Sequence, residues 1–265
     1  MNFPTLSVNL CEHPPWVIAS PRFNRHPLPL EIQGVRRTHR SLFDRLDALA
    51  DPAARVRRFR DYMGMVFRIG GWRRESSRPA RRSLRNSYLR FLRGWMADAS
   101  STEGAVLKGW VESRFGIAPT FHAGLIEGVA SERYLLYLAE RMRESASSNA
   151  IESQLDVVYE FVQYELRRRQ PGVSTFTLYR GVRNIEDYRF LGEPGEKHAV
   201  VRLNNLNSFS SRIEHAWEFG SHLLEAEVPA PKIFFRSDIL PGVLPKGEEE
   251  ALVIGGEYEV TVRSY

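Results

Sequence analysis

Cysteine is almost absent from this chain of 265 residues, in which Cys11 is the only one. A single cysteine cannot form an internal disulfide, so a secreted domain held together by disulfides is excluded. Cys11 lies in a proline-bearing stretch without a set of Cys and His partners, which argues against a zinc site. A reducing cytoplasm is the compartment that this composition fits best.

Long apolar runs are also missing. No window approaches the roughly 18 consecutive apolar residues of a membrane span. Residues 1–20 lack the positive region and the continuous apolar core of a signal peptide. We therefore expect a soluble protein that is not exported and does not enter a membrane.

The common nucleotide-binding and metal-binding patterns are absent as well. The chain has no Gly-x-Gly-x-x-Gly motif, no Walker loop and no metal-ligand cluster. Its histidines show no spacing of a catalytic triad or a metal site, and we interpret most of them as surface or satisfied core residues. A dinucleotide would therefore be bound without a dinucleotide-binding fold and without a metal.

The net charge of +5 suits either nucleic acid or an acidic protein as a partner. Residues 68–93 hold nine arginines against one glutamate, which most commonly indicates a solvated face or loop. The functional interpretation is docking of an acidic protein or of nucleic acid. Because Tyr88 and Phe91 share a helical stripe with Leu84 and Trp95, we expect them in the core rather than stacked on bases. Protein docking is favoured.

The composition and apolar spacing of the chain change twice, which divides it into three regions. Residues 1–34 are rich in proline and predict an extended arm that packs through Trp16, Val17, Ile18 and Phe23. Residues 35–170 predict a helical domain, because apolar residues recur at helical spacing. That spacing is found in residues 42–49, 56–66, 84–95, 101–116, 131–144 and 151–166. Residues 70–79 interrupt it with Gly, Ser, Arg and Pro and predict a surface loop.

Residues 171–265 change to short runs of β-branched and aromatic residues separated by turn residues, which are typical of strands. The predicted strands are residues 176–179, 199–203, 223–228, 232–235, 251–254 and 258–262. A helical insert at about residues 213–219 breaks the series. Helices followed by strands predict an α+β fold.

Three strings in the β part stand out together: residues 178–181 (Leu-Tyr-Arg-Gly), residues 207–211 (Asn-Ser-Phe-Ser-Ser) and residues 247–254 (Gly-Glu-Glu-Glu-Ala-Leu-Val-Ile). Each alone is weak. A strand ending in Arg-Gly is common, a serine pair is usually a turn or a helix cap, and an acidic triplet is usually solvated. Their order and their positions at strand edges are informative.

In this order the strings resemble the arginine-serine-glutamate class of mono-ADP-ribosyltransferases, whose motifs are Arg on a first strand, then Ser-x-Ser, then Glu-x-Glu at the start of a strand. The similarity is wider for the branch that modifies dinitrogenase reductase in nitrogen-fixing bacteria. It extends through residues 23–32, 87–90, 104–116, 203–206 and 252–256.

This resemblance implies a split β-sandwich catalytic core at residues 171–265 and NAD+ as a consumed co-substrate. It implies transfer of ADP-ribose to an arginine of dinitrogenase reductase, which switches nitrogen fixation off. It also leaves room for a nitrogen-status signalling protein as a second partner. By resemblance, the loop at residues 237–247 would meet the acceptor protein, although its composition suits a plain solvated turn equally well.

The two glutamates of the motif suit this chemistry. Residues two apart in a strand point to the same side, so Glu248 and Glu250 share a face while Glu249 points away. Breaking the nicotinamide–ribose bond generates positive charge on the sugar, which a carboxylate stabilises, and Glu250 is our candidate. A guanidinium is a poor nucleophile because its pKa lies above about 12. A second carboxylate, Glu248, would orient it and take its proton.

The remaining motif residues are expected to hold NAD+. Arg180 can make bidentate contacts to diphosphate or ribose oxygens, and the alternative for it is a buried ion pair. By resemblance, the Gly181 backbone would hold the nicotinamide amide and Ser208 would orient Glu250. Ser210 is the second serine of the motif, and Phe209 stands where relatives commonly have threonine.

Two alternatives to this function remain open at the level of sequence. The same chemistry could act on a different protein, or on water as an NAD+ glycohydrolase. A non-enzymatic basic module that binds protein or nucleic acid would leave the glutamates with a structural role, and salt-dependent binding without consumption of NAD+ would identify it.

Overall fold

The computed structural model describes residues 5–6, 8–69, 86–143, 148–191, 198–244 and 249–264. Most of its helices precede its strands, which confirms the α+β fold class. The helices are α1 (Pro15–Ile18), α2 (Pro21–Arg25), α3 (Val35–Thr38), α4 (Arg40–Asp47), α5 (Pro52–Val66), α7 (Tyr88–Ala97), α8 (Thr102–Phe115), α9 (Glu132–Arg143), α10 (Ser148–Arg169) and α11 (Ile213–Trp217). The strands are β1 (Thr175–Val182), β2 (Arg189–Leu191), β3 (His198–Ser210), β4 (His222–Pro229), β5 (Ile233–Arg236) and β6 (Glu250–Ser264).

The helical periodicity of residues 42–66 and 101–166 is confirmed by α4, α5, α8, α9 and α10, and the helical insert by α11. The predicted loop at residues 70–79 lies outside the described residues, as does Leu84. Tyr88 and Phe91 are buried, which confirms their place in the core. None of the helices within the described ranges is long and apolar enough to cross a membrane.

The N-terminal stretch is partly helical, which corrects the prediction of an extended arm. α1 and α2 each begin at a proline, a residue that is favoured at the first helical position because its missing N–H has no helical partner there. Ile18 and Phe23 are buried as predicted. Trp16 was expected to anchor this stretch but is 66% exposed. Proline content therefore predicted interruptions correctly but not the short helices between them.

The described strands form one six-stranded antiparallel sheet in the order β2-β3-β1-β4-β6-β5. β3 pairs with β6 as well as with β1 and β2. Because β1 pairs with β4 and β4 pairs with β6, these pairings join β3, β1, β4 and β6 into a ring. The ring brings the start of β6 beside the end of β3.

Strand boundaries differ from the prediction in three places. The predicted runs 251–254 and 258–262 form one strand, β6, which continues through Gly255 and Gly256. These glycines permit a close approach: a Cβ on Gly255 would lie 1.6 Å from the carbonyl oxygen of Asn204 on β3. β3 continues beyond residue 203 into the serine motif, and β2 was not predicted.

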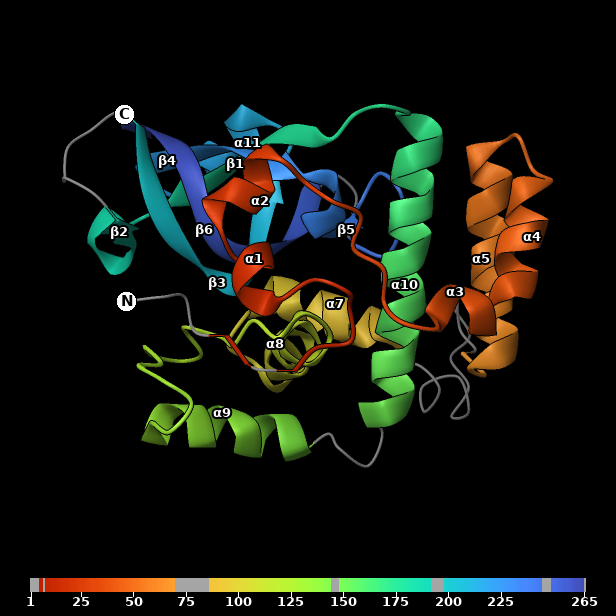
Figure 1. Ribbon diagram of the computed structural model, residues 1–265, viewed down its shortest axis with the longest axis horizontal. Coiled ribbons are helices and arrows are strands. Elements are labelled where there is room, and N and C mark those ends of the chain that lie inside the picture. The colour runs from red at the N-terminus through yellow and green to blue at the C-terminus, as the bar shows by residue number, and fades with distance from the viewer. Residues whose placement is uncertain are drawn as a thin grey trace.

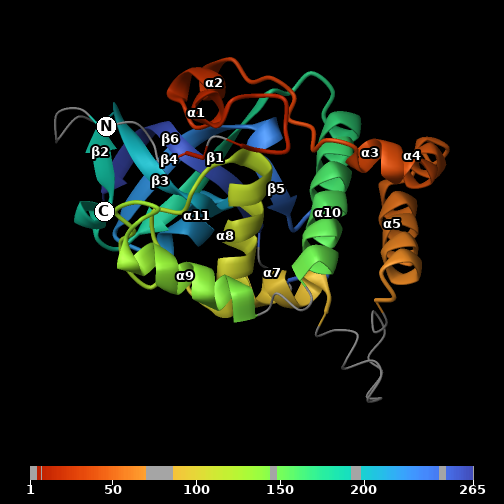
Figure 2. The ribbon, with the colours of Figure 1, turned by 60° about the horizontal axis from the view of Figure 1, so that its bottom comes forward.

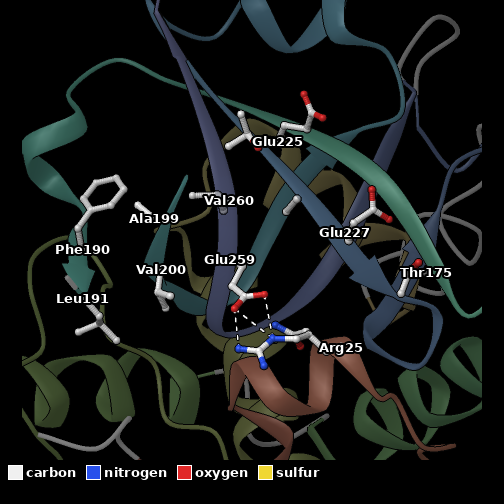
Figure 3. Close-up of a pocket in the computed structure, with 13 residues that line it drawn as sticks. Arg25, Thr175, Phe190, Leu191, Ala199, Val200, Glu225, Glu227, Glu259 and Val260 are labelled. Atoms are coloured by element: carbon white, nitrogen blue, oxygen red, sulfur yellow. Dashed lines mark hydrogen bonds and ion pairs between the residues drawn. The ribbon is translucent and has the colours of Figure 1, made fainter. Parts of the chain in front are cut away.

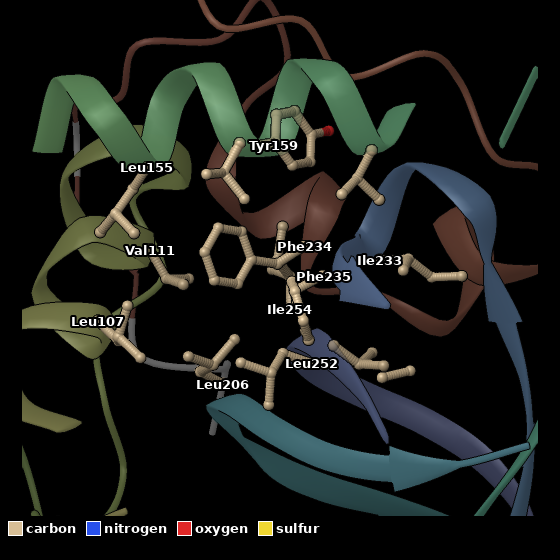
Figure 4. Packing of buried hydrophobic residues seen from close by; sticks show 14 of the residues in the cluster. Leu107, Val111, Leu155, Tyr159, Leu206, Ile233, Phe234, Phe235, Leu252 and Ile254 are labelled. Atoms are coloured by element: carbon tan, nitrogen blue, oxygen red, sulfur yellow. The ribbon is translucent and has the colours of Figure 1, made fainter. Parts of the chain in front are cut away.

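α10 separates the pair α4 and α5 from the sheet (Figure 1; Figure 2). The sequence predicted a single apolar stripe for this helix, yet its polar side is buried too. Glu165 pairs with Arg55 at 2.5 Å and Glu160 pairs with Arg36 at 2.8 Å. Each buried carboxylate thus has an arginine partner that compensates its charge. The helical part and the sheet share one hydrophobic core, in which Val111, Leu155, Phe234 and Ile254 lie close together (Figure 4).

Candidate functional site

The described motif residues meet around one cavity of about 270 Å³. Arg180 and Gly181 come from β1, Ser208 and Ser210 from β3, and Glu250 from the first position of β6. Tyr179 is the register partner of Ser210, and Ser210 is the register partner of Glu250. Residues more than 60 positions apart in the sequence are therefore brought to one end of three paired strands. Glu248 lies outside the described residues.

Glu250 is a buried carboxylate, with 7% of the residue exposed. Its backbone position is fixed by Ser237: the N–H of Glu250 donates to Ser237 Oγ at 3.1 Å, and the N–H of Ser237 donates to the Glu250 carbonyl at 3.0 Å. Because the residue is buried, water has little access to its side chain. Exclusion of water strengthens any electrostatic interaction between the carboxylate and a bound cationic centre.

The two serines of the motif hold different positions relative to Glu250. Ser210 lies directly opposite Glu250 in the β3–β6 pair, whereas Ser208 lies opposite Leu252. Directly opposite residues on antiparallel strands place their side chains on the same face, with Cβ atoms about 4.5–5.5 Å apart. Ser210 is therefore the serine next to Glu250, and Ser208 is its diagonal neighbour.

Each of these hydroxyls accepts a hydrogen bond from a fixed donor. The indole N–H of Trp95 donates to Ser208 Oγ at 2.9 Å, and the backbone N–H of Arg212 donates to Ser210 Oγ at 3.0 Å. Since a serine hydroxyl carries one proton of its own, each serine keeps a donor for a neighbouring group. The site thus presents two oriented hydroxyl donors on the face of Glu250.

Arg180 is half-buried and is held by neutral oxygens. Its Nη1 donates to the Ser208 carbonyl at 2.7 Å, and its Nε and Nη2 each donate to the hydroxyl of Tyr188 at 3.2 Å. Among the residues that the structure describes, no ion pair joins Arg180 to a carboxylate, so the alternative of a buried ion pair finds no support there. The guanidinium is therefore available to pair with an anionic ligand at the cavity wall.

Gly181 has a steric reason to be glycine. A Cβ at this position would lie 1.9 Å from the carbonyl oxygen of Ala216, because α11 packs closely across β1. His215 and Phe219 from this helical insert line the cavity, and their rings lie edge to face with centroids 5.3 Å apart. The glycine therefore allows α11 to form one wall of the site.

A larger cavity of about 990 Å³ adjoins the first. Both are lined by Trp95, Ala99, Arg180 and Ser208, so they are parts of one cleft. Both parts have sizes comparable with ligand sites, which are usually about 300–1,000 Å³. The cleft runs from Glu250 between the end of the sheet and the helical part.

Sequence reasoning missed two residues that the helical part contributes to this cleft. Trp95 was assigned to the core, and it is 4% exposed, but its indole N–H reaches the serine motif. Lys108 lines the larger part of the cleft and is 1% exposed. Its ammonium donates to the Phe121 carbonyl at 2.9 Å and lies 3.2 Å from His122 Nδ1, and burial lowers its pKa to about 8. A lysine inside an otherwise apolar helical stripe was the only signal in the sequence.

A third cavity of about 680 Å³ lies elsewhere on the sheet and contains none of the predicted residues. Figure 3 shows Arg25 and Glu259 paired there, at 2.6 Å, with Glu225 and Glu227 on the neighbouring strand. Three carboxylates and one paired arginine do not suit an anionic dinucleotide. Among the residues within the described ranges, no group of three His, Cys, Asp or Glu side chains is arranged to hold a metal ion.

Comparison with known proteins bears on the whole chain. Residues 8–262 match the family model described as dinitrogenase reductase ADP-ribosyltransferase. A relative from Rhodospirillum rubrum, NAD(+)--dinitrogen-reductase ADP-D-ribosyltransferase, is 42% identical over 259 residues, which cover 96% of this chain and 94% of the relative. No solved structure matches the chain.

These matches confirm the resemblance to the family and define an enzyme class that transfers ADP-ribose from NAD+. The chain belongs to the dinitrogenase reductase ADP-ribosyltransferase family.

Proposed function

We propose that this protein transfers ADP-ribose from NAD+ to an arginine of dinitrogenase reductase, releases nicotinamide and so switches nitrogen fixation off in the cytoplasm. The observation that carries the proposal is the buried carboxylate of Glu250 at the wall of a cleft that also holds Arg180 and both motif serines. The acceptor follows from the name of the relative from Rhodospirillum rubrum, which is identical at 42% of the aligned positions.

The fold supports the proposal through its strand pairing. We assign the ring of β3, β1, β4 and β6 to the split β-sandwich core of ADP-ribosyltransferases. Residues 171–265 would then be the catalytic domain, residues 35–170 the helical domain and residues 1–34 an N-terminal arm. The shared hydrophobic core means that the helical domain also shapes the cleft.

The charge and donors of the cleft fit NAD+. Arg180 supplies a half-buried guanidinium for the diphosphate, which prefers the paired N–H groups of an arginine. The Gly181 backbone would hold the nicotinamide amide, and α11 packs closely against this glycine. Ser208 and Ser210 offer hydroxyl donors on the face of Glu250. A lysine of reduced basicity, Lys108, adds a second cationic group farther along the cleft.

Glu250 is proposed to stabilise the positive charge that develops on the ribose as the bond to nicotinamide breaks. Its burial matters because a carboxylate in a site shielded from water stabilises such a charge more strongly than one in water. Ser210, directly opposite in the strand pair, would hold the carboxylate in place. The Ser237 hydrogen bonds hold the backbone on the other side.

Glu248 is proposed, from its spacing in the sequence, to orient the acceptor guanidinium and to take its proton. The preceding loop would meet the acceptor protein. Its described part is anchored rather than solvated, since Ile239, Leu240 and Val243 are fully buried. Arg93 from α7 donates to the Val243 carbonyl at 2.9 Å, so the helical part braces the loop.

The test is incubation of the protein with labelled NAD+ and purified dinitrogenase reductase, followed by mass spectrometry of the reductase. Glu250→Gln should lower transfer by about 100-fold or more while NAD+ binding is retained. Glu249→Gln is the matched control, because its side chain is 46% exposed and it occupies the neighbouring position. Unmodified reductase together with consumed NAD+ would instead favour a different acceptor or a glycohydrolase. Full activity of Glu250→Gln would contradict the assigned role.

A further inference from the structure

The buried side of α9 carries two tyrosines and an arginine that contact one carboxylate. Tyr134 and Tyr137 are buried, and their hydroxyls donate to the Glu112 carboxylate on α8 at 2.6 and 3.1 Å. Arg141 reaches the same carboxylate at 3.2 Å and Glu152 at 3.0 Å. α9 is therefore held to α8 mainly by hydrogen bonds and ion pairs. Its buried apolar contacts form a small cluster separate from the main core.

The outward side of α9 exposes three large apolar side chains. Leu135 is 58% exposed, Leu136 is 49% exposed and Met142 is 66% exposed. Residues 135 and 142 are separated by seven positions, so they lie on one face of the helix. A surface helix of a globular protein usually turns its apolar stripe toward the core. α9 instead leaves three large apolar side chains exposed in addition to its buried side, and such an exposed patch marks an interaction surface.

Further exposed apolar residues lie at the rim of the cleft. The segment before α9 exposes Phe121, Leu125 and Val129. Phe121 and Leu125 also line the larger part of the cleft, beside Lys108 and Arg180. Two views show α9 alongside α8, with α10 between α9 and α5 (Figure 1; Figure 2). We name Leu125, Val129, Leu135, Leu136 and Met142 the α9 face.

We propose that the α9 face docks the protein that accepts ADP-ribose, an inference that rests on the proposed function. A folded acceptor has to cover the mouth of the cleft in order to bring an arginine to Glu250. A specific interface buries roughly 800 Å² on each partner, so it extends over the rim of the cleft. Phe121 and Leu125 are exposed apolar residues that line the cleft, and they lie in the segment just before α9.

The size and surroundings of the α9 face suit a transient complex. Stable homodimers bury roughly 2,000 Å² or more in total and are more apolar. The α9 face has a few exposed apolar side chains, and exposed charged residues of both signs, Glu132, Arg133 and Arg143, flank it. An apolar centre with a charged rim is the usual composition of interfaces that dissociate.

The experiment compares Leu135→Glu, Leu136→Glu and Met142→Glu with Met65→Glu. Met65 is the matched control because it is 67% exposed, nearly the same as Met142, and belongs to α5, which α10 separates from the sheet (Figure 1). Two quantities are measured for each variant: kcat/KM for dinitrogenase reductase and, without the reductase, the Kd for NAD+ by calorimetry. Thermal unfolding and sedimentation report folding and oligomeric state.

We expect the α9 variants to lower kcat/KM for the reductase by about tenfold or more, as for residues at the centre of an interface, with Kd for NAD+ within about twofold of the wild type. Met65→Glu should change neither quantity. Unchanged kcat/KM in all three variants would overturn the docking site, and so would a parallel loss of NAD+ binding in folded protein. A wild-type dimer that these substitutions dissociate would assign the face to a second copy instead. If the wild type binds NAD+ but does not modify the reductase, the proposed function fails, and the docking proposal fails with it.

Discussion

The indole N–H of Trp95 donates a hydrogen bond of 2.9 Å to the hydroxyl of Ser208, across 113 positions of sequence. This contact joins α7 of the helical part to the serine motif on β3. The carbonyl of the same serine accepts a hydrogen bond from Arg180 at 2.7 Å. Trp95 therefore positions a residue that in turn holds the guanidinium at the cleft wall.

Trp95→Phe tests this positioning role. The substitution keeps most of the apolar volume but removes the donor, so the Ser208 hydroxyl is free to reorient. We expect KM for NAD+ to rise by about three- to tenfold, because one neutral hydrogen bond contributes about 1 kcal/mol. Steady-state kinetics measure this change. Trp110→Phe is the control, since its indole donates at 2.7 Å to Asp156 on α10, away from the cleft, and should lower stability without changing KM.

The two motif serines are expected to differ. Ser210→Ala removes the hydroxyl directly opposite Glu250 and should lower kcat by about tenfold, the loss of about 1.4 kcal/mol of stabilisation in the transition state. Ser208→Ala should raise KM for NAD+ as Trp95→Phe does. The double variant Trp95→Phe/Ser208→Ala should have a KM little higher than either single variant, because both substitutions remove the same contact. Equal kcat values for Ser208→Ala and Ser210→Ala would contradict the assignment of Ser210 as the serine that holds Glu250.

Gly181→Ala tests the close approach of α11 to β1. The added methyl would lie 1.9 Å from the Ala216 carbonyl oxygen, so α11 has to move. Such overpacking typically costs about 1–3 kcal/mol, and displacement of the cavity wall should also weaken NAD+ binding. Denaturant unfolding and calorimetry measure the two effects. Gly128→Ala is the matched control, because a Cβ there meets no atom within 4 Å. A stable Gly181→Ala protein with unchanged affinity would show that α11 does not constrain the site.

Lys108 gives a prediction for the dependence of stability on pH. Burial lowers its pKa from 10.5 in the unfolded chain to about 8 in the folded chain, against the opposing effects of Asp98 and Glu140. Below pH 8 both states hold the proton and the cost of burial is present in full. Between pH 8 and 10.5 the unfolded chain holds more protons than the folded chain, so this residue makes the free energy of unfolding rise with pH.

The rise should amount to about 2 kcal/mol between pH 7.5 and 9.5, relative to Lys108→Met, in which the titrating group is absent. Urea unfolding of both proteins across this interval measures the difference. The interval ends at pH 9.5 because tyrosine in the unfolded chain ionises near pH 10. Above that pH the buried tyrosines would make the free energy of unfolding fall, which opposes the effect of Lys108. A constant difference between the two proteins would show that the Lys108 pKa is not lowered.

Much of the local structure was predictable, because apolar spacing reports directly on the exposed face of an element. The spacing in residues 101–116 and 151–166 predicted α8 and α10, and residues 213–219 predicted α11. The errors arose where contacts between residues far apart in the sequence determine the structure. Gly255 and Gly256 suggested a turn, but they lie inside β6 where the chain passes close to β3. Trp16 was expected to be buried, but its short helix turns the side chain to solvent.

The sequence by itself indicated the candidate site residues and their order along the chain, which are an arginine, two serines and a glutamate at predicted strand edges. It also determined the class of fold, because periodicity is a local property of the chain. Only the tertiary structure decided that Ser210, rather than Ser208, lies opposite Glu250, because register depends on how β3 and β6 pair. It also decided that Trp95 and Lys108 line the cleft and that α9 exposes Leu135, Leu136 and Met142. Hydrogen bonds between residues far apart in sequence set these positions, and no local pattern reports such bonds.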